Sequence, residues 1–369
     1  MNHFAKIAEK LNTYGLDGML LTCEANRFYA SGFHSTGTDG VALVTREGNF
    51  YFTDSRYIEA AHNKVQNAEI AQTDAAHPYV DLINAAMEKT HVQKLGFEDA
   101  YMTVADYRHY SEKLHCELVP ATELLISLRQ SKDAEEVERM IAAQRIAEGA
   151  LDQILKEIKP GVTEKEIAAR LQYLMLAGGA ENMSFDPIVA SGPNGSMPHA
   201  VPTDRKIQEG DFVTMDFGCI YQGYCSDMTR TFFCGQPDPK QAAIHDLVRE
   251  ANEIAEQLVR PGVPLYELDK AARDHIAAAG YGEYFTHRLG HFIGQKEHEK
   301  GDVSLSATET AKPGMIFSIE PGVYLPGEFG VRVEDLVLVT EDGCEILNHV
   351  DKHLSLIHIS EPTRPLYIS

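Results

Sequence analysis

The sequence predicts an α+β protein with two domains, the second of them a duplicated α/β unit. In the first third of the chain, short β-rich runs alternate with amphipathic segments, which is typical of an α/β domain. The remainder carries one plan twice, a pair of helices followed by β segments, which indicates an internal duplication around a pseudo-twofold axis. A length of 369 residues suits two domains. We expect these domains at residues 1–128 and 129–354.

The first domain is expected to contain a hairpin and at least three helices. An apolar run at Met19–Thr22 predicts one strand. The runs Val41–Val44 and Asn49–Thr53 flank Glu47-Gly48 and predict a pair of antiparallel strands. Three amphipathic segments predict helices, namely residues 4–14, 54–66 and 78–90.

The duplication is visible where the helices of the second domain end. Residues 159–162 read Lys-Pro-Gly-Val and residues 260–263 read Arg-Pro-Gly-Val, and each tetrapeptide separates two helical segments. Each helix pair precedes a β segment that ends on a carboxylate, Asp216 in the first copy and Glu320 in the second. In both copies a glycine stands six residues before that carboxylate. The matched offset favours duplication over chance similarity.

Capping residues indicate where these helices begin. Ser131 is the expected N-cap of the first long helix, because acidic residues follow it, and Lys159-Pro160-Gly161 is expected to end this helix. Thr163 and Glu166 have the spacing of a capping box for the next helix. In the second copy, a helix is expected from Pro239 to Val259.

Two hairpins are expected to bring carboxylates together in pairs. In the first, a two-residue loop at Tyr221-Gln222 would set Asp216 directly opposite Asp227. In the second, the turn lies midway between Glu320 and Glu334, so these two would also face each other. Like charges at paired positions repel each other, and a shared proton, an arginine or a metal ion must offset the repulsion.

A metal centre is the interpretation that these pairs favour. If the two hairpins meet at the twofold axis, four carboxylates converge, and such oxygen ligands suit Mn, Co or Zn. Four carboxylates fit two ions with shared ligands better than one ion. Four histidines stand among glycine and proline residues, which indicates loops shaped for close approach rather than helix faces. These histidines are His199, His287, His291 and His298.

The ordered set of carboxylates and one histidine resembles the metal ligands of the pita-bread metallopeptidases. The matching residues, at spacings of 11, 64, 29 and 14, are Asp216, Asp227, His291, Glu320 and Glu334. Over nearly its whole length the chain is similar to the Xaa-Pro peptidases of this family, prolidase (Xaa-Pro dipeptidase) and aminopeptidase P. The resemblance implies a creatinase-like N-terminal α/β domain followed by a pita-bread catalytic domain. It also implies a homodimer that holds two divalent ions, manganese first and cobalt or zinc as alternatives, and cleaves proline-containing peptides.

The resemblance further implies which residues carry the chemistry. In the family's mechanism, two ions lower the pKa of a shared water, and Glu320 would handle its proton. His298 and His199 would stabilise the tetrahedral oxyanion or hold the substrate, and His287 would shape the proline pocket. Hydrolysis before proline, most directly of Xaa-Pro dipeptides, is therefore the expected activity.

Three positions bear on the substrate. Arg332 shares a strand face with Glu334 and would hold a ligand or a substrate carboxylate. Tyr324 stands where the family has an active-site tyrosine. Where the family usually has glycine after the metal-binding histidine, this chain has Phe292. We expect its ring to narrow the pocket or weaken metal binding, and Phe292→Gly to raise activity.

Composition excludes several other classes. A net charge of −22 argues against nucleic acid as a partner, because phosphates would be repelled. No apolar run approaches the roughly 18–20 residues that span a bilayer, so no membrane partner is expected. We expect no signal peptide, because the first residues are polar and amphipathic. The six cysteines form no Cys-x-x-Cys pair, so we expect reduced thiols in a cytoplasmic protein.

Four alternatives stay open at this point. Aminopeptidase P acts on longer Xaa-Pro peptides, and methionine aminopeptidase shares the five ligands but usually lacks the N-terminal domain. Creatinase shares both domains without the full metal set, and a catalytically inactive peptide-binding protein on this fold belongs to another functional class. Residues 355–369 look like a translated sequencing adapter and are expected to be a non-native, disordered tail.

Overall fold

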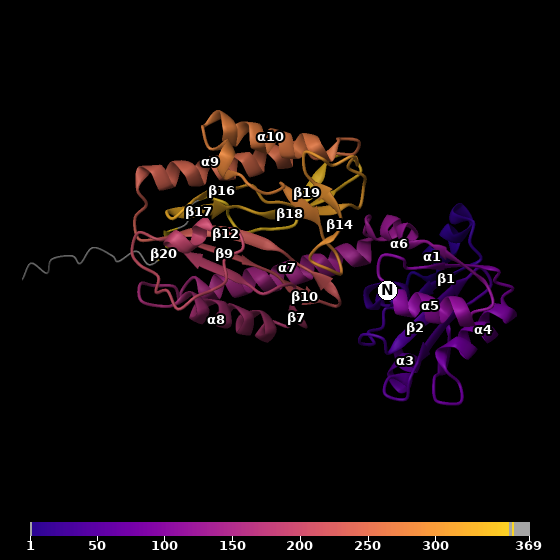
Figure 1. Ribbon diagram of the computed structural model, residues 1–369. Coiled ribbons are helices and arrows are strands. Elements are labelled where there is room, and N and C mark those ends of the chain that lie inside the picture. The colour runs from indigo at the N-terminus through magenta and orange to yellow at the C-terminus, as the bar shows by residue number, and fades with distance from the viewer. Residues whose placement is uncertain (1, 354–355, 358–369) are drawn as a thin grey trace, which may run out of the picture. The chain divides into compact units, whose positions relative to one another are not determined.

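The computed structural model describes residues 2–353 and 356–357. The chain divides into two compact units, Met1–Arg129 and a second that begins at Gln130 (Figure 1). Each unit has its own hydrophobic cores. Within the described ranges, no helix is both long and apolar enough to cross a lipid bilayer.

The first unit is a six-stranded mixed sheet with helices, in the order β4-β3-β2-β1-β5-β6. The predicted hairpin is confirmed, since Val44 pairs with Asn49 in antiparallel register. The predicted helices are present but shorter, and three further helices, α2 (Glu24–Ser31), α5 (Val104–Lys113) and α6 (Thr122–Arg129), were not predicted. The strands are β1 (Gly18–Leu21), β2 (Gly40–Thr45), β3 (Asn49–Thr53), β4 (Glu69–Gln72), β5 (Lys94–Phe97) and β6 (Glu117–Pro120). The helices are α1 (Phe4–Leu11), α2 (Glu24–Ser31), α3 (Ile58–Lys64), α4 (Tyr79–Lys89), α5 (Val104–Lys113) and α6 (Thr122–Arg129).

The second unit contains two helix pairs and several small sheets. Its helices are α7 (Ala134–Ile154), α8 (Glu164–Ala177), α9 (Pro239–Leu258) and α10 (Leu265–Ala278). The strands of its first half are β7 (Asn182–Met183), β8 (Ile188–Ser191), β9 (Phe212–Phe217), β10 (Cys219–Tyr221), β11 (Tyr224–Cys225) and β12 (Met228–Cys234). The strands that follow are β13 (Gly290–Phe292), β14 (Glu299–Val303), β15 (Ile316–Ile319), β16 (Gly322–Leu325), β17 (Phe329–Arg332), β18 (Asp335–Val339), β19 (Cys344–Ile346) and β20 (Leu356–Ile357).

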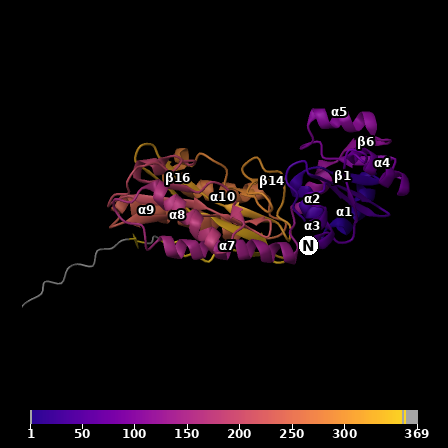
Figure 2. The ribbon, with the colours of Figure 1, turned by 90° about the horizontal axis from the view of Figure 1, so that it is seen from below.

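The two helix pairs cover opposite sides of the strands, as the duplicated plan requires (Figure 1, Figure 2). Apolar residues of α7 and α8 pack in one core with β8, β9 and β12. Those of α9 and α10 pack in another core with β13, β15 and β18. The second unit is therefore a pita-bread fold built from two α/β halves.

The backbone between the helices repeats in detail. The N–H of Gly161 donates to the carbonyl of Ile207 at 2.9 Å, and the N–H of Gly262 donates to the carbonyl of Ala311 at 2.8 Å. Both glycines have left-handed φ angles, 97° and 86°, which favour glycine at each Pro-Gly stop. The predicted duplication is thus confirmed at equivalent positions of the two halves.

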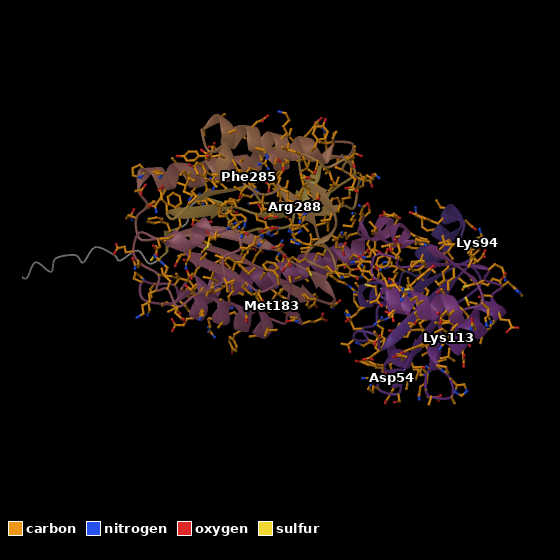
Figure 3. All side chains as sticks on the ribbon, in the orientation of Figure 1. Asp54, Lys94, Lys113, Met183, Phe285 and Arg288 are labelled. Atoms are coloured by element: carbon orange, nitrogen blue, oxygen red, sulfur yellow. The ribbon has the colours of Figure 1, made fainter. Side chains whose placement is uncertain are left out.

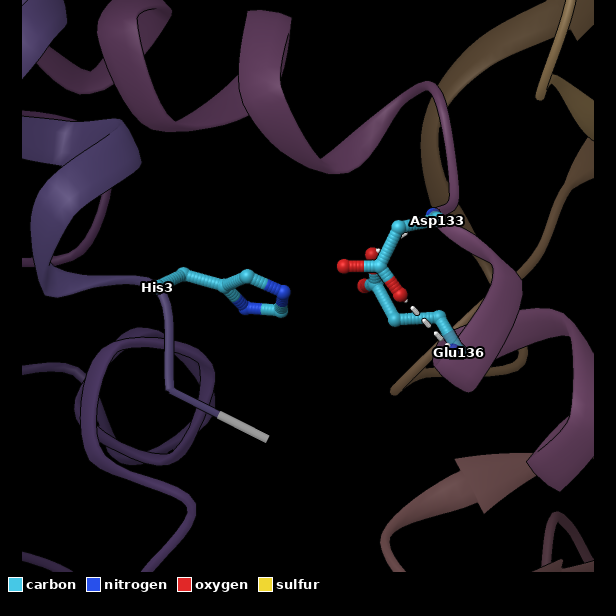
Figure 4. Close-up of side chains that lie close together, drawn as sticks. All are labelled: His3, Asp133 and Glu136. Carbon is cyan, nitrogen blue, oxygen red and sulfur yellow. Dashed lines mark hydrogen bonds between the residues drawn. The ribbon is translucent and has the colours of Figure 1, made fainter. Parts of the chain in front are cut away.

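The N-cap of α7 is Asp133, so the prediction of Ser131 is wrong. Asp133 and Glu136 form a reciprocal capping box, drawn with dashed hydrogen bonds in Figure 4. Ser131 instead makes an antiparallel bridge with Met315, which holds it in extended backbone. The capping box of Thr163 at the start of α8 is confirmed.

The end of the chain differs in part from the expectation. Leu356 and Ile357 form β20, which pairs in parallel with Phe233 and Cys234 of β12. The expected disorder therefore does not extend to these two residues. The rest of the tail predicted at 355–369 lies outside the described residues.

Candidate active site

A cavity of about 340 Å³ in the second unit collects nearly all the predicted site residues. Tyr324 is the one predicted residue that does not line it. Arg288, labelled in Figure 3, also contributes to its wall. The predicted residues that line the cavity are His199, Asp216, Asp227, His287, His291, His298, Glu320, Arg332 and Glu334.

The first carboxylate hairpin has a different register from the predicted one. Asp216 pairs with Thr229, so it does not lie directly opposite Asp227. The turn residues are Gln222 and Gly223, with φ angles of 47° and 78°. Positive φ at both central positions is the geometry of a type I′ turn, which prefers glycine second and leaves the preceding tyrosine in the strand. Asp227 lies in the break between β11 and β12, two residues before Thr229, which is the actual partner of Asp216.

The second carboxylate hairpin has the predicted register. Ile319 pairs with Asp335 in β15 and β18, and the same register continues through β16 and β17. Glu320 and Glu334 are the residues adjacent to that pair, so they stand opposite each other. The prediction that these glutamates face each other is confirmed.

Side chains from both hairpins and from β13 meet in one cluster. Ligand atoms of Asp227, His291 and Glu334 all lie within 4.8 Å of one another. The Nε2 atom of His291 is 3.6 Å from Asp227 Oδ2 and 3.5 Å from Glu320 Oε1. Buried Oδ1 atoms of Asp216 and Asp227 have no hydrogen-bond partner among the described residues. Buried anionic oxygens without donors are costly, and a bound cation satisfies them.

Burial and mutual repulsion raise the pKa values of the clustered carboxyls. Burial raises the pKa of Asp227 well above its usual range, and Glu334 and Asp216 raise it further. Burial, with Glu320 and Asp216, likewise raises the pKa of Glu334. Burial raises the pKa of Glu320 to about 7, although Arg332 opposes this rise. These carboxyls therefore need a counter-charge to ionise together at neutral pH.

His291 has the protonation state of a neutral metal ligand. Burial and the neighbouring His298 lower its pKa to about 3, which keeps the imidazole uncharged. Its Nδ1 lies 3.3 Å from the carbonyl oxygen of Phe292, so Nε2 is left to face the carboxylates. His291 lies on strand β13, and the expectation that it belongs to a loop is wrong.

Two hydroxyl residues that the sequence analysis missed hold the carboxylates in place. Thr229 Oγ1 donates to Glu334 Oε2 at 2.7 Å. Ser318 Oγ donates to Glu320 Oε1 at 3.2 Å and accepts from the backbone N–H of His291 at 3.0 Å. Each lies two residues from a predicted ligand in the sequence, Thr229 after Asp227 and Ser318 before Glu320. In an extended chain, residues at this spacing share a face, which is the signal that could have identified both.

A buried hydrogen-bonded chain runs from the cluster to His287. Arg332 donates to Asp216 Oδ2 at 2.6 Å and to the hydroxyl of Tyr324 at 2.8 Å. That hydroxyl is 2.9 Å from Nε2 of His287. Burial raises the pKa of Tyr324 to about 12, and burial together with Arg332 lowers the pKa of His287 to about 4. Arg332 thus contacts a carboxylate of the cluster and, through Tyr324, orients a cavity histidine.

The remaining cavity histidines are more exposed. His298 stacks edge-on against His291, with ring centroids 4.1 Å apart. His199 lies exposed on the cavity wall, after the short helix Gly192–Ser196. Glu297, which the sequence analysis did not select, also lines the cavity. Burial and the charge of Asp216 raise the pKa of Glu297 to about 7.

Phe292 does not narrow the cavity, and the expectation that it would is wrong. Its side chain is fully buried in the core and packs against Phe317 at a centroid distance of 5.7 Å. Successive side chains of a strand point to opposite faces. Because His291 faces the cavity, Phe292 faces away from it.

The duplicated fold and this carboxylate–imidazole cluster define a metal-dependent peptidase of the pita-bread class. The chain belongs to metallopeptidase family M24, which matches residues 138–341, and falls in its prolidase branch. The creatinase/prolidase N-terminal domain matches residues 4–131. The protein is therefore a metallopeptidase.

Relatives of known structure cover almost the whole chain. The chain is 38% identical to the Xaa-Pro dipeptidase from Bacillus anthracis, with a TM-score of 0.90, covering 96% of this chain and 99% of that one. It is 33% identical to an X-Pro aminopeptidase from Thermotoga maritima, with a TM-score of 0.88 and coverage of 93% and 98%. It is 34% identical to the prolidase from Pyrococcus horikoshii, with a TM-score of 0.87 and coverage of 95% and 99%. By sequence it is 38% identical to an uncharacterized peptidase of Bacillus subtilis, covering 95% of this chain and 99% of the relative.

Proposed function

We propose that the protein is an Xaa-Pro dipeptidase that uses two divalent metal ions. The observation that carries the proposal is the cluster in one cavity of four carboxylates and a neutral imidazole, with buried oxygens that lack a hydrogen-bond donor in the described part of the chain. Two solved relatives named for Xaa-Pro or prolidase activity share the fold over almost all of the chain.

The metal would be held by the five residues matched to the family pattern, with manganese as our first choice and cobalt or zinc as alternatives. These ligands are Asp216, Asp227, His291, Glu320 and Glu334. The donor set fits hard or borderline cations, since oxygens dominate and the imidazole is uncharged. When bound, such ions lower the pKa of a coordinated water and polarise the scissile carbonyl.

The residues of the chain would then manage protons and charge. Glu320 would accept the proton of the attacking water and return it to the leaving proline nitrogen, since its raised pKa suits proton exchange near neutrality. His298 and His199 would donate to the oxyanion as it forms. His287, oriented by Tyr324 and Arg332, would form a wall of the proline pocket.

The proposed pocket explains why this bond would be selected. A peptide nitrogen of proline carries no hydrogen, so a site that demands an N–H donor cannot position it. The buried chain from Arg332 to His287 presents a fixed polar wall beside the cluster.

We also propose a homodimer and domains at residues 1–128 and 129–354, with 355–369 as a non-native tail.

Aminopeptidase P activity is the second candidate, because the aminopeptidase from Thermotoga maritima is almost as similar as the dipeptidases. Manganese-loaded protein should be assayed on Ala-Pro, Ala-Pro-Ala and Met-Ala-Ser. Cleavage of Ala-Pro alone supports the dipeptidase, and cleavage of Ala-Pro-Ala as well indicates aminopeptidase P. Cleavage of Met-Ala-Ser alone would indicate methionine aminopeptidase. No cleavage with Mn, Co or Zn would favour the inactive binding protein.

A further inference from the structure

Glu297 presents a carboxylate to the cavity that the proposed metal centre does not use. It lies in the loop between β13 and β14, and its side chain is 30% exposed. Its Oε1 atom is 3.5 Å from Nε2 of His298. In the described part of the chain, no lysine or arginine forms an ion pair with Glu297.

Carboxylates of the metal centre already have hydrogen-bond donors. Arg332 binds Asp216, and Thr229 binds Glu334. Glu297 is not one of the five residues that we assign to the metal centre. A half-buried carboxylate that has an imidazole but no lysine or arginine beside it is complementary to a positive charge on a ligand.

An Xaa-Pro dipeptide offers only two positions for such a charge. One is the α-ammonium group, which is two bonds from the scissile carbonyl carbon and must therefore stay close to the metal ligands. The other is the side chain of Xaa, since the side chain of proline is apolar. A lysine or arginine side chain is long enough to reach from the reacting carbonyl to a carboxylate on the cavity wall.

We infer that Glu297 selects substrates with a basic residue before proline, Lys-Pro and Arg-Pro among dipeptides. The inference rests on the proposed function and adds a substrate preference to it. Glu297 is then a specificity-determining residue, because it would contact the substrate side chain and not the reacting atoms.

The test compares Lys-Pro with norleucyl-proline, which keeps the four-carbon chain and lacks the ammonium group. With manganese-loaded protein at pH 8, we expect kcat/KM for Lys-Pro to exceed that for norleucyl-proline by about tenfold. In Glu297→Gln the ratio should fall to about one. Glu341→Gln, which removes a charge from an exposed turn, is the matched control and should keep the ratio of the wild type. Thermal unfolding verifies that each variant is folded.

Three results would overturn the inference while leaving the proposed function intact. These are a wild-type ratio near one, a ratio that Glu297→Gln does not change, or an equal loss on both dipeptides. The equal loss would assign Glu297 to the α-ammonium group that both dipeptides share. An enzyme that hydrolyses neither dipeptide would overturn the proposed function, and the inference with it.

Discussion

Phe292 and Gly301 fill one space between β13 and β14. A side-chain carbon attached to Gly301 would lie 2.4 Å from the ring of Phe292, which is too close for any other residue. Gly301 also has a φ of 132°, a backbone conformation that favours glycine. Because Gly301 has no side chain, the neighbouring strand leaves room in the core for the ring of Phe292.

Phe292→Gly should therefore destabilise the protein. Removal of a fully buried ring leaves a cavity, and we expect the free energy of unfolding to fall by about 3–5 kcal/mol. Urea denaturation of both proteins with metal chelated measures this difference. Leu305→Ala, at an exposed position, is the control and should change stability little. Unchanged stability with raised activity would instead restore the idea that Phe292 narrows the pocket.

Asp227→Asn should remove most of the stabilisation that the protein gains from manganese. Without metal, the substitution replaces a buried carboxyl whose ionisation is opposed by burial and by Glu334 and Asp216, so the variant should unfold at no lower temperature than the wild type. Manganese at about 100 times its Kd should stabilise the wild type by about 2.7 kcal/mol and the variant by much less. Calorimetry with and without manganese measures both effects, with exposed Asp342→Asn as the control. A variant that gains as much stability from manganese as the wild type would remove Asp227 from the metal site.

Glu320 should make the metal-free protein less stable as pH rises. Its pKa in the folded state is about 7, above the ordinary glutamate value of 4.5, so the folded state binds more protons than the unfolded state between these values. Relative to Glu320→Gln, which cannot ionise, the wild type should lose stability from about pH 4.5 to about pH 7 and change little above that. Urea midpoints of the two chelated proteins across this range test the sign. A wild type that gains stability relative to the variant would show that the pKa of Glu320 is lowered.

Lys352 should stabilise the folded protein through its contacts with three buried polar side chains. Its Nζ atom is 2.6 Å from Asp335 Oδ2 and 2.8 Å from Asn252 Oδ1, and it also binds Glu256. Lys352→Met would leave two buried carboxylates short of a partner, and we expect a loss of about 3 kcal/mol. The exposed Lys312→Met is the matched control. Equal stability of the two variants would mean that Arg230, which also binds Asp335, suffices alone.

Most structural features that depend on short-range sequence patterns could be predicted from the sequence. Capping at Thr163 and the second hairpin register follow from short-range chemistry, and the structure agrees with both. The stop expected at Lys159-Pro160-Gly161 was wrong, because α7 already ends at Ile154. The first hairpin register was wrong, because the pair Gln222-Gly223 makes the turn and a single-residue shift moves every partner.

Other features could not be read from one segment alone. Ser131 has the composition of an N-cap, yet its bridge to Met315, distant in sequence, holds it extended. The side of the strand that Phe292 occupies depends on Gly301, on another strand. Such features depend on tertiary partners rather than on local preference, so neighbouring residues in the chain carry no signal of them.

The most direct test of the central claim is the release of proline from Ala-Pro by chelated protein before and after manganese is restored, alongside Asp227→Asn. The account predicts no release from the chelated protein, full release when manganese returns, and a loss of at least about 100-fold in the variant. Release that persists after chelation, or that survives Asp227→Asn, would contradict it.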